Sequence, residues 1–330
     1  MSRYARQMQL PDMGPEGQAR LARARVLVVG AGGLGCPALQ YLVGAGVGQI
    51  TIVDADVVSV TNLHRQILYR EDDVNHPKAQ RAAETLAPLN SEVVLTPVIA
   101  ALTPSNAPAL VADHDIVLDC ADSFAVSYIL SDICKGTTPL ISASALGSAG
   151  YVGGFCGPAP SLRAVFPDLP QRAATCATAG VMGPVVGMLG AAQAQMTLGV
   201  LLGHSPSPLG QMLSFDMGSL KSSQFRFDAA PDPEPDMIFI APNQITSNDW
   251  VVDLRAKAEG PLVTPEAQRM VVADFDSPPT PTGRAVLTCR SGLRAWQAGT
   301  RLRATWDGPI TLIALGDTPG PSFETERQPS

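Results

Sequence analysis

The chain opens with apolar runs separated by a glycine-rich turn and a helix-like stretch. Residues 26–29 form a short β-branched run, which is typical of a strand buried on both faces. The stretch that follows predicts a helix from about Gly35 to Gly46, with Gly46 as its C-cap. Residues 50–53 predict a second strand. This order of strand, turn, helix and strand predicts a βαβ unit of a parallel sheet.

The same alternation of apolar and polar segments continues toward residue 156. We expect further strands at 93–98, 115–120, 139–145 and 150–156, and helices at 78–86, 104–113 and 124–135. The predicted fold class is therefore α/β, with a Rossmann-like domain around a mostly parallel central sheet.

Residues 181–202 are long and apolar enough to suggest a membrane span. Gln193 and Gln195, with small residues around them, favour instead a buried helix of a soluble domain. The first residues contain no apolar signal core, and the six cysteines include no C-x-x-C pair. We therefore predict free thiols, a cytoplasmic location and no membrane partner.

The 330-residue chain is long enough for two domains, and a proline-rich acidic stretch at 229–236 predicts the connection between them. We expect a first domain at 1–228, a linker at 229–237, a second domain at 238–317 and a flexible tail at 318–330. The formal net charge of −7 argues against a nucleic-acid partner, which would need a basic face.

The turn after the first strand fits a phosphate-binding motif. Gly30, Gly32 and Gly35 match G-x-G-x-x-G, where glycines let a phosphate approach the backbone at a helix N-terminus. Asp54 ends the second strand, where a carboxylate can accept hydrogen bonds from ribose hydroxyls. These features predict a bound nucleotide without saying which one, so a dinucleotide-dependent oxidoreductase stays open.

Charged residues follow these strands closely. Arg65 and Lys78 are cations that a polyphosphate would need, although most such residues simply form a solvated face. Asp122 follows the fourth strand, at the edge where ligands bind in a parallel sheet. It could bind Mg²⁺ or cap the helix after it, since aspartate is a good N-cap.

Taken in order, these residues resemble the ThiF/MoeB/HesA family, the bacterial relatives of ubiquitin-activating enzymes. The resemblance covers about residues 2–227 and rests on Tyr4-x-Arg6-Gln7, Gly30-Ala-Gly-Gly-Leu-Gly35, Asp54-x-Asp56, Thr61-Asn62-Leu63-x-Arg65-Gln66, Pro77-Lys78, Asp119-Cys-Ala-Asp122 and Thr175-Cys-Ala-Thr-Ala-Gly-Val-Met-Gly-Pro184. It implies that MgATP adenylates the C-terminal Gly-Gly carboxylate of a ubiquitin-like sulfur carrier. The acyl-adenylate would then become a thiocarboxylate for thiamine thiazole or molybdopterin biosynthesis.

The resemblance also implies roles for individual residues. Those that would hold ATP are Gly30, Gly32, Gly33, Gly35, Asp54, Asp56, Asn62, Arg65, Gln66, Lys78, Asp122 and Ser123. Those that would act in catalysis are Arg6, Arg65, Lys78, Asp122, Cys176 and Cys289. Asp122 would bind Mg²⁺, Arg6 would reach the partner's site in a homodimer, and Cys176 would form a covalent sulfur link to the carrier.

Two departures from the family pattern keep other readings open. Ser123 stands where the family usually has asparagine, and the two C-x-x-C pairs of a structural zinc site are missing, the first being replaced at Ser161 and Ala164. Because zinc needs four such ligands, we predict no zinc. A non-catalytic member of the family remains an alternative. A member that acts on tRNA is disfavoured by the acidic balance.

The second domain contains a candidate sulfur site. Strand-like segments at 250–255 and 285–289 are followed by Cys289 and a loop leading into a helix. Arg290, Arg294 and the helix N-terminus would stabilise a thiolate or persulfide. With Asp253-Leu-Arg255, this loop resembles a rhodanese-like sulfurtransferase domain, and a cysteine desulfurase is a candidate sulfur donor. A degenerate domain kept for docking is the alternative, because the region between the two pieces lacks a further expected segment.

Overall fold

The computed structural model describes residues 3–169 and 180–316, and the chain forms two compact units that divide between Glu234 and Pro235. This boundary falls inside the stretch for which the sequence predicts a linker. Each unit has its own sheet. The tail expected at 318–330 lies outside the described residues.

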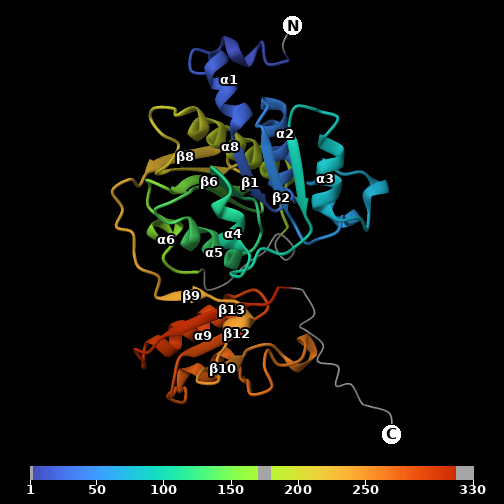
Figure 1. Ribbon diagram of the computed structural model, residues 1–330. Helices are drawn as coiled ribbons and strands as arrows, with labels where there is room; N and C mark the ends of the chain where they lie inside the picture. The colour runs from blue at the N-terminus through green and yellow to red at the C-terminus, as the bar shows by residue number, and fades with distance from the viewer. Residues whose placement is uncertain (1–2, 170–179, 317–330) are drawn as a thin grey trace. The chain divides into compact units, whose positions relative to one another are not determined.

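The first unit is built on an eight-stranded sheet with the order β3-β2-β1-β4-β5-β6-β7-β8 (Figure 1). The strands are β1 (Arg25–Val29), β2 (Gln49–Val53), β3 (Val94–Val98), β4 (Ile116–Asp119), β5 (Pro139–Leu146), β6 (Ala149–Cys156), β7 (Gln211–Asp216) and β8 (Lys221–Arg226). Strands β3 to β5 pair in parallel, whereas β6, β7 and β8 pair antiparallel. The predicted α/β fold class is confirmed.

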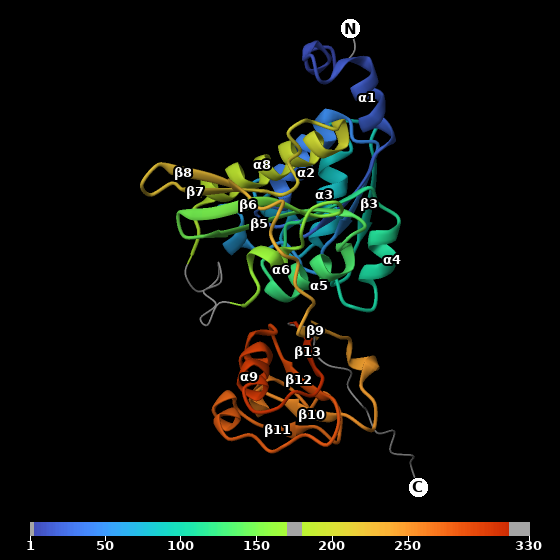
Figure 2. The same cartoon turned by 90° about the vertical axis from the view of Figure 1, so that its left-hand side faces the viewer.

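Helices cover both faces of this sheet. They are α1 (Gly14–Arg23), α2 (Gly35–Ala45), α3 (Lys78–Leu86), α4 (Ala107–Ala112), α5 (Phe124–Cys134), α6 (Leu162–Val165) and α8 (Gly183–Leu202), with short 3-10 turns η1 (Gln7–Gln9), η2 (Val60–Asn62) and η3 (Glu71–Asp73). Figure 2 shows α2, α3 and α8 on one face and α4 and α5 on the other. This arrangement follows from right-handed crossovers that leave β1 toward one edge of the sheet and β4 toward the other.

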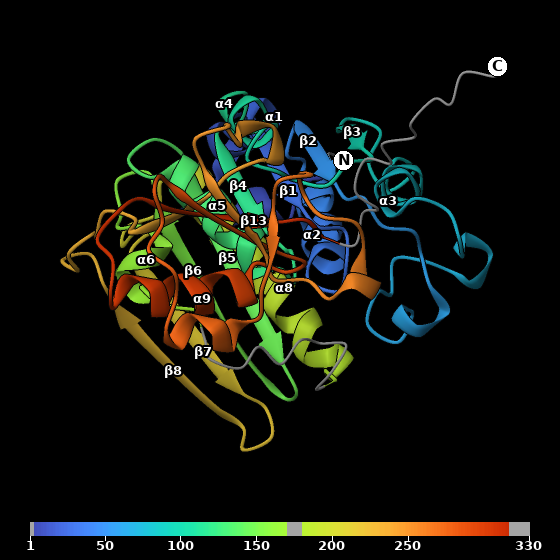
Figure 3. The same ribbon diagram turned by 90° about the horizontal axis from the view of Figure 1, so that it is seen from below.

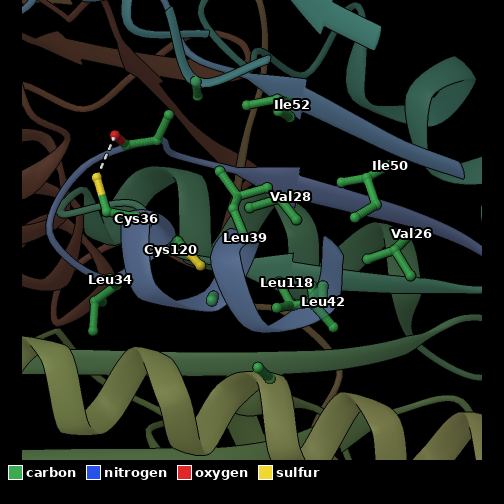
Figure 4. Packing of buried hydrophobic residues seen from close by; sticks show 14 of the residues in the cluster. Val26, Val28, Leu34, Cys36, Leu39, Leu42, Ile50, Ile52, Leu118 and Cys120 are labelled. Atoms are coloured by element: carbon green, nitrogen blue, oxygen red, sulfur yellow. Dashed lines mark hydrogen bonds between the residues drawn. The ribbon is translucent and has the colours of Figure 1, made fainter. Parts of the chain in front are cut away.

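The core lies between the parallel strands and α2. Strand β1 is buried along its length from Val26, as expected for a strand with helices on both faces. Figure 4 shows side chains from α2 meeting those of three strands. The residues that it labels on these elements are Val26, Val28, Ile50, Ile52, Leu118, Cys36, Leu39 and Leu42. Helix α2 ends at Gly46, whose φ of 80° makes it the left-handed C-cap that the sequence predicts.

Helix α8 is the apolar segment that could be mistaken for a membrane span. Among the described residues it is the one helix long and apolar enough to cross a membrane, and half of its most apolar window is buried within the fold. It packs against α2, β5 and β6. The prediction of a helix packed into the domain is confirmed by these contacts.

The antiparallel side of the sheet is larger than the sequence predicts. Strands β7 and β8 were not expected, and β8 reads as a polar loop because every residue of it is exposed. It forms the sheet edge beside β7, as Figure 3 shows. An exposed edge strand has no buried face, so its sequence carries no alternation of apolar and polar residues.

The second unit has a five-stranded parallel sheet with the order β11-β10-β12-β13-β9. Its elements are β9 (Met237–Phe239), η4 (Pro242–Gln244), β10 (Trp250–Asp253), η5 (Lys257–Glu259), β11 (Gln268–Arg269), η6 (Val272–Asp276), β12 (Ala285–Cys289), α9 (Leu293–Arg303) and β13 (Ile310–Ala314). The strands expected at 250–255 and 285–289 are confirmed, although β10 ends at Asp253. Strand β9 starts one residue before the expected second domain.

The close packing of the glycine turn after β1 predicts that one added methyl group, at Gly35, lowers the stability of the fold. A Cβ at Gly35 would overlap the Gly30 carbonyl oxygen, whereas a Cβ at Gly44, on the exposed face of the same helix, would meet nothing within 4 Å. We expect Gly35→Ala to lower the free energy of unfolding by about 1–3 kcal/mol. Gly44→Ala should raise it by about 0.5–1 kcal/mol, because alanine is the better helix former. Urea unfolding followed by circular dichroism measures both, and equal effects would contradict this packing.

Candidate nucleotide site and sulfur loop

The glycine turn joins the ends of β1 and β4. Gly30 has a φ of +98°, and a Cβ there would lie 2.6 Å from the Cys120 carbonyl oxygen, so only glycine fits. A Cβ at Gly35 would lie even closer, 2.0 Å from the Gly30 carbonyl oxygen. The turn therefore lies between β1 and β4, where the strand order of the parallel sheet reverses. Ligands of open α/β sheets bind at this point. Helix α2 starts there, with its free N–H groups at the turn.

Asp54 ties the end of β2 to this turn. Its carboxylate accepts hydrogen bonds from the backbone N–H groups of Ala31 (2.7 Å) and Asp56 (2.8 Å). Burial raises the pKa of Asp54, while the nearby Lys78 ammonium and these N–H groups lower it. Each carboxylate oxygen has a second lone pair, so the group can brace the turn and still accept a ligand hydroxyl.

The segment after β2 folds over the glycines. The Asn62 carbonyl oxygen accepts hydrogen bonds from the backbone N–H groups of Arg65 (3.1 Å) and Gln66 (3.0 Å), which forms a tight turn. An added Cβ at Gly32 would lie 3.5 Å from Gln66 Nε2, and one at Gly33 would lie 3.5 Å from Arg65 Cδ. The structure thus brings these three predicted residues to the glycine turn. Gln66 is 3% exposed, and its Oε1 has no hydrogen-bond partner among the described residues.

Helix α8 also reaches this place, which the sequence did not predict. A Cβ at Gly33 would lie 2.7 Å from Val186, and a Cβ at Gly183 would lie 2.6 Å from the His64 carbonyl oxygen. The first turn of α8 therefore packs between the glycine turn and the segment that carries Arg65. Farther along α8, Gln193 Nε2 donates to the Asp119 carbonyl oxygen at 2.8 Å, which fixes the helix to β4.

Lys78 is buried at the other side of the turn. Its Nζ donates to Asp56 Oδ2 at 2.9 Å, and the Lys78 side chain is 6% exposed whereas the Asp56 side chain is 72% exposed. The Tyr69 hydroxyl lies within hydrogen-bond distance of the Ala31 (2.7 Å) and Lys78 (3.2 Å) carbonyl oxygens. Lys78 is thus linked to the glycine turn, and its charge is balanced by a carboxylate that faces solvent.

The end of β4 supplies two carboxyl groups. Asp122 is exposed in the loop that follows Cys120, whose carbonyl oxygen touches Gly30. The N-cap position of α5 is occupied by Ser123, whose side chain makes no capping hydrogen bond. The alternative in which Asp122 is the N-cap is therefore wrong, because the helix starts one residue later than that role requires. Asp122 is left available at the edge where ligands bind.

Asp119 is a site residue that the sequence analysis missed. It is fully buried, and burial raises its pKa to about 6, although hydrogen bonds from Ser127 and Ser142 lower it. Its Oδ2 accepts from the Ser142 hydroxyl at 2.8 Å, and its Oδ1 accepts from the Ala121 N–H at 3.3 Å. An acidic residue that ends an otherwise apolar strand was the available signal. Its carboxyl group orients the loop that carries Asp122.

The predicted catalytic residue Arg6 lies away from this turn. Arg6 is exposed just before η1, and the neighbouring Gln7 donates to the Ala45 carbonyl oxygen at 2.9 Å. Because Ala45 ends α2 and Gly35 starts it, Arg6 lies at the opposite end of that helix from the glycine turn. Cys176 lies outside the described residues.

The second unit encloses the Cys289 sulfur. Cys289 ends β12 and is 0% exposed, and its Sγ accepts hydrogen bonds from the backbone N–H groups of Gly292 (3.1 Å) and Ala295 (3.4 Å). Gly292 takes a φ of +87°, which turns these N–H groups inward before α9. Such a ring of N–H donors at a helix N-terminus stabilises an anion at the sulfur. The loop from Cys289 to Arg294, called the sulfur loop from here on, therefore has the arrangement of donors that the sequence predicts.

Metal-binding residues do not gather elsewhere in the described part of the chain. Among residues 3–169 and 180–316, no group of three His, Cys, Asp or Glu side chains could hold a metal ion. The expectation of no structural zinc stays a prediction. Asp122 remains the one residue for which the sequence predicts a role at magnesium.

The buried carboxyl group of Asp119 predicts a pH dependence of stability. Its pKa of about 6 lies above the ordinary 3.8, so between these two pH values the folded chain binds more protons than the unfolded chain. Stability should therefore fall as pH rises from about 4 to about 6.5, by about 1–3 kcal/mol, and then level off. In Asp119→Asn this loss should disappear, which urea unfolding between pH 4.5 and pH 8 measures. Parallel profiles of the two proteins would contradict the burial of an acid here.

Comparisons with known proteins cover the first unit. A family model described as "ThiF family" matches residues 4–237. The "Adenylyltransferase and sulfurtransferase MOCS3" of Sus scrofa is 46% identical over 218 residues, which are 65% of this chain and 48% of that protein. The chain thus spans about half the length of this relative. The "SAMP-activating enzyme E1" of Haloferax volcanii is 38% identical over 235 residues, covering 70% of this chain and 87% of that protein.

Solved structures show the same fold. E. coli MccB superposes with a TM-score of 0.63 at 22% identity, covering 71% of this chain and 73% of that chain. The complex of MccB with ATP superposes with a TM-score of 0.60 at 21% identity, covering 69% and 72%. These similarities concern the fold alone. Because the family model covers most of the chain, including the glycine turn, Lys78 and Asp122, the chain belongs to the ThiF family.

Proposed function

We propose that this chain is an ATP-dependent adenylyltransferase that acts on the C-terminal glycine carboxylate of a ubiquitin-like sulfur-carrier protein. One observation carries the proposal. Three separate segments bring Arg65, buried Lys78 and Asp122 to a glycine turn at the start of a helix. A dinucleotide-dependent oxidoreductase would need the turn and Asp54 but gives no reason for this set of charges.

The turn and Asp54 would hold the nucleoside end of ATP. The open backbone around Gly32 and Gly33 lets a phosphate approach the N-terminus of α2, where N–H groups and the helix dipole favour an anion. Asp54 is already held by two backbone N–H groups, so its remaining lone pairs are fixed in direction. A ribose hydroxyl donating to this carboxylate would place the phosphates over the glycines.

The cations would hold the triphosphate. Lys78 is buried and paired with the exposed Asp56. An incoming phosphate oxygen could therefore replace the Asp56 carboxylate, or bind the ammonium together with it, and the buried ammonium would stay paired. Arg65 offers a fork of donors beside Gly33. Asn62 and Gln66, on the same tight turn, would add uncharged hydrogen bonds. Asp122, an exposed carboxylate, suits Mg²⁺, which would neutralise phosphate charge.

The proposed reaction has two stages. A carboxylate oxygen of the carrier's last glycine attacks the α-phosphorus, the bond to the bridging oxygen breaks, and pyrophosphate leaves. Negative charge grows on the phosphate oxygens during this step, and Arg65 and Lys78 would stabilise it. The terminal sulfur of a Cys289 persulfide would then attack the acyl carbon, and AMP leaves to give an acyl disulfide. A second thiol would attack the Cys289 sulfur of that disulfide, so that the thiocarboxylate leaves with the electron pair. The cysteine disulfide formed in this step would be reduced by an external thiol.

The names of the relatives support this proposal. They describe an adenylyltransferase and sulfurtransferase in Sus scrofa and a SAMP-activating E1 in Haloferax volcanii. By extension we propose a carrier of that kind, serving thiamine thiazole or molybdopterin biosynthesis, and a rhodanese-like role for the second unit. Cys289 would carry the sulfur, received from a cysteine desulfurase. Cys176 would form the covalent link to the carrier.

We also propose a homodimer. Arg6 lies at the end of α2 opposite the glycine turn, so it cannot serve the site of its own chain through short-range contacts. It is exposed and no ion pair involves it among the described residues. Reaching a second copy's nucleotide site would give this arginine the role that the family resemblance implies.

Adenylation predicts carrier-dependent exchange of pyrophosphate into ATP. We expect labelled pyrophosphate to enter ATP only when MgATP and a purified carrier ending in Gly-Gly are both present. Arg65→Ala, Lys78→Ala and Asp122→Asn should each slow the exchange about 100-fold or more. The first two remove a cation that would stabilise the reacting phosphate, and the third removes the carboxylate that would hold Mg²⁺ there. Thiamine-type and molybdopterin-type carriers are tested side by side.

Arg23→Ala is the matched control for these variants. Arg23 is exposed at the end of α1, which precedes β1 and lies away from the glycine turn, so its loss should leave exchange unchanged. Exchange that persists in the Lys78 and Asp122 variants, or that is absent with every carrier, would count against adenylation.

The sulfur step predicts a separation of the two activities. Cys289→Ser should retain carrier-dependent exchange and lose sulfur transfer from a persulfide donor, because oxygen cannot carry the sulfane sulfur. Mass spectrometry of the carrier, which detects the thiocarboxylate, measures the second activity. Thiocarboxylate formed at the normal rate by this variant would show that Cys289 is not the sulfur carrier.

A further inference from the structure

Arg294, at the start of the helix that follows Cys289, is already paired within the chain. Arg294 Nη2 and Nη1 donate to the two carboxylate oxygens of Glu259, at 2.5 and 2.8 Å, which is a bidentate pair. Nη1 also donates to the Leu254 carbonyl oxygen at 2.9 Å. Arg294 immediately precedes Ala295, whose backbone N–H donates to Cys289 Sγ at 3.4 Å. The donor fork that faces the sulfur loop is therefore filled by the chain's own carboxylate.

Glu259 is held firmly in this position. Its Oε2 also accepts a hydrogen bond from the Ala256 N–H at 2.7 Å, which closes the turn η5. Hydrogen bonds from Arg294 and Ala256, with the Arg290 charge farther off, lower the pKa of Glu259 to about 2. The carboxylate is thus ionised throughout the pH range in which sulfur transfer would take place, and it stays on Arg294.

The two other arginines that line the neighbouring pocket also have partners within the chain. A pocket of 300 Å³ is lined by Leu254, Arg255, Ala256, Arg269, Met270, Val271, Val272, Asp274 and Arg294. Arg255 forms a bidentate pair with buried Asp253, and Arg269 donates to two carbonyl oxygens. Asp274, also in the lining, accepts a hydrogen bond from the Val271 N–H at 2.8 Å.

We propose that Glu259 is a specificity residue of the sulfur loop. By filling the Arg294 fork it excludes small dianionic sulfur donors such as thiosulfate, and it leaves the loop to a persulfide carried on a protein cysteine. This inference rests on the proposed sulfur transfer at Cys289. A dianion would have to displace a carboxylate held by three hydrogen bonds, whereas a protein persulfide brings at most one charge and needs no arginine fork.

Both donors would react by the same displacement. The Cys289 thiolate attacks the outer sulfur of thiosulfate, the S–S bond breaks and sulfite leaves with the electron pair, so Cys289 becomes a persulfide. With a protein persulfide, the thiolate attacks the terminal sulfur and the donor cysteine leaves as a thiolate. No external oxidant or reductant enters either step. The two reactions differ in the charge that must approach Arg294.

The test compares both donors on the full-length chain. Sulfur loading of Cys289 is measured by mass spectrometry with thiosulfate and with a cysteine desulfurase charged by cysteine. We expect the unaltered chain to accept sulfur from the desulfurase and to react poorly with thiosulfate. Glu259→Gln should raise kcat/KM for thiosulfate about tenfold or more, because the freed guanidinium can bind the dianion. Its rate with the desulfurase should change little.

Asp276→Asn is the matched control. Asp276 pairs with Arg301, on the same helix as Arg294 but two turns later, so this variant breaks an ion pair of the same kind away from the sulfur. It should not gain activity with thiosulfate. Retained loading by the desulfurase shows that each variant is folded.

The outcomes separate the inference from the proposed function. If the desulfurase loads Cys289 but Glu259→Gln and Glu259→Ala gain nothing with thiosulfate, the role of Glu259 is wrong and sulfur transfer stands. If the unaltered chain already uses thiosulfate as well as the desulfurase, the exclusion is also wrong. If neither donor loads Cys289 in any variant, the proposed sulfur transfer fails and the inference falls with it.

Discussion

The close approach of backbone at the end of β1 is the constraint on which the nucleotide site depends. Gly30 touches the Cys120 carbonyl oxygen and Gly35 lies directly against Gly30, so no side chain can separate these segments. The contact joins the carboxyl ends of β1 and β4 and starts α2 at the same point. It also leaves a surface of bare backbone, over which the segment carrying Arg65 and Gln66 can fold.

Two buried charged residues, Lys78 and Asp119, lie near this contact. Lys78 is buried, but its ammonium meets Asp56, a carboxylate in contact with solvent, so the pair avoids the full cost of a buried ion pair. Asp119 is buried without a cation, and its raised pKa reflects that cost. The buried cation of this site is thus paired with a solvent-exposed acid, whereas the buried acid Asp119 has a raised pKa.

In the second unit, Arg294 is likewise paired within the chain, but its partner Glu259 is 27% exposed whereas Asp56 is 72% exposed. The backbone N–H groups of Gly292 and Ala295 contact the sulfur. A cation whose partner faces solvent can exchange that partner for an anionic ligand more readily than one held by a bidentate, partly buried carboxylate. This contrast agrees with a triphosphate in one unit and a protein-borne sulfur in the other.

Local patterns were enough to predict the parallel part of the sheet, the ends of α2 and α3, and the sulfur loop, because each depends on residues adjacent in sequence. The strand ending at Val29, the C-cap at Gly46 and the start of α3 at Lys78 are of this kind. The site residues could be named from spaced motifs, but their contacts could not.

Only the tertiary structure decided which distant segments meet. The packing of α8 against Gly33, the bond from Gln193 to β4, the burial of Asp119 and the pairing of Glu259 with Arg294 all join residues far apart along the chain. Strand β8 could not be predicted from the sequence, because an exposed edge strand carries no apolar pattern. The sequence by itself determined the elements and the chemistry available at their ends. Long-range packing determined which charges are buried, which are paired and which are left for a ligand, because burial and pairing depend on neighbours that no local pattern encodes.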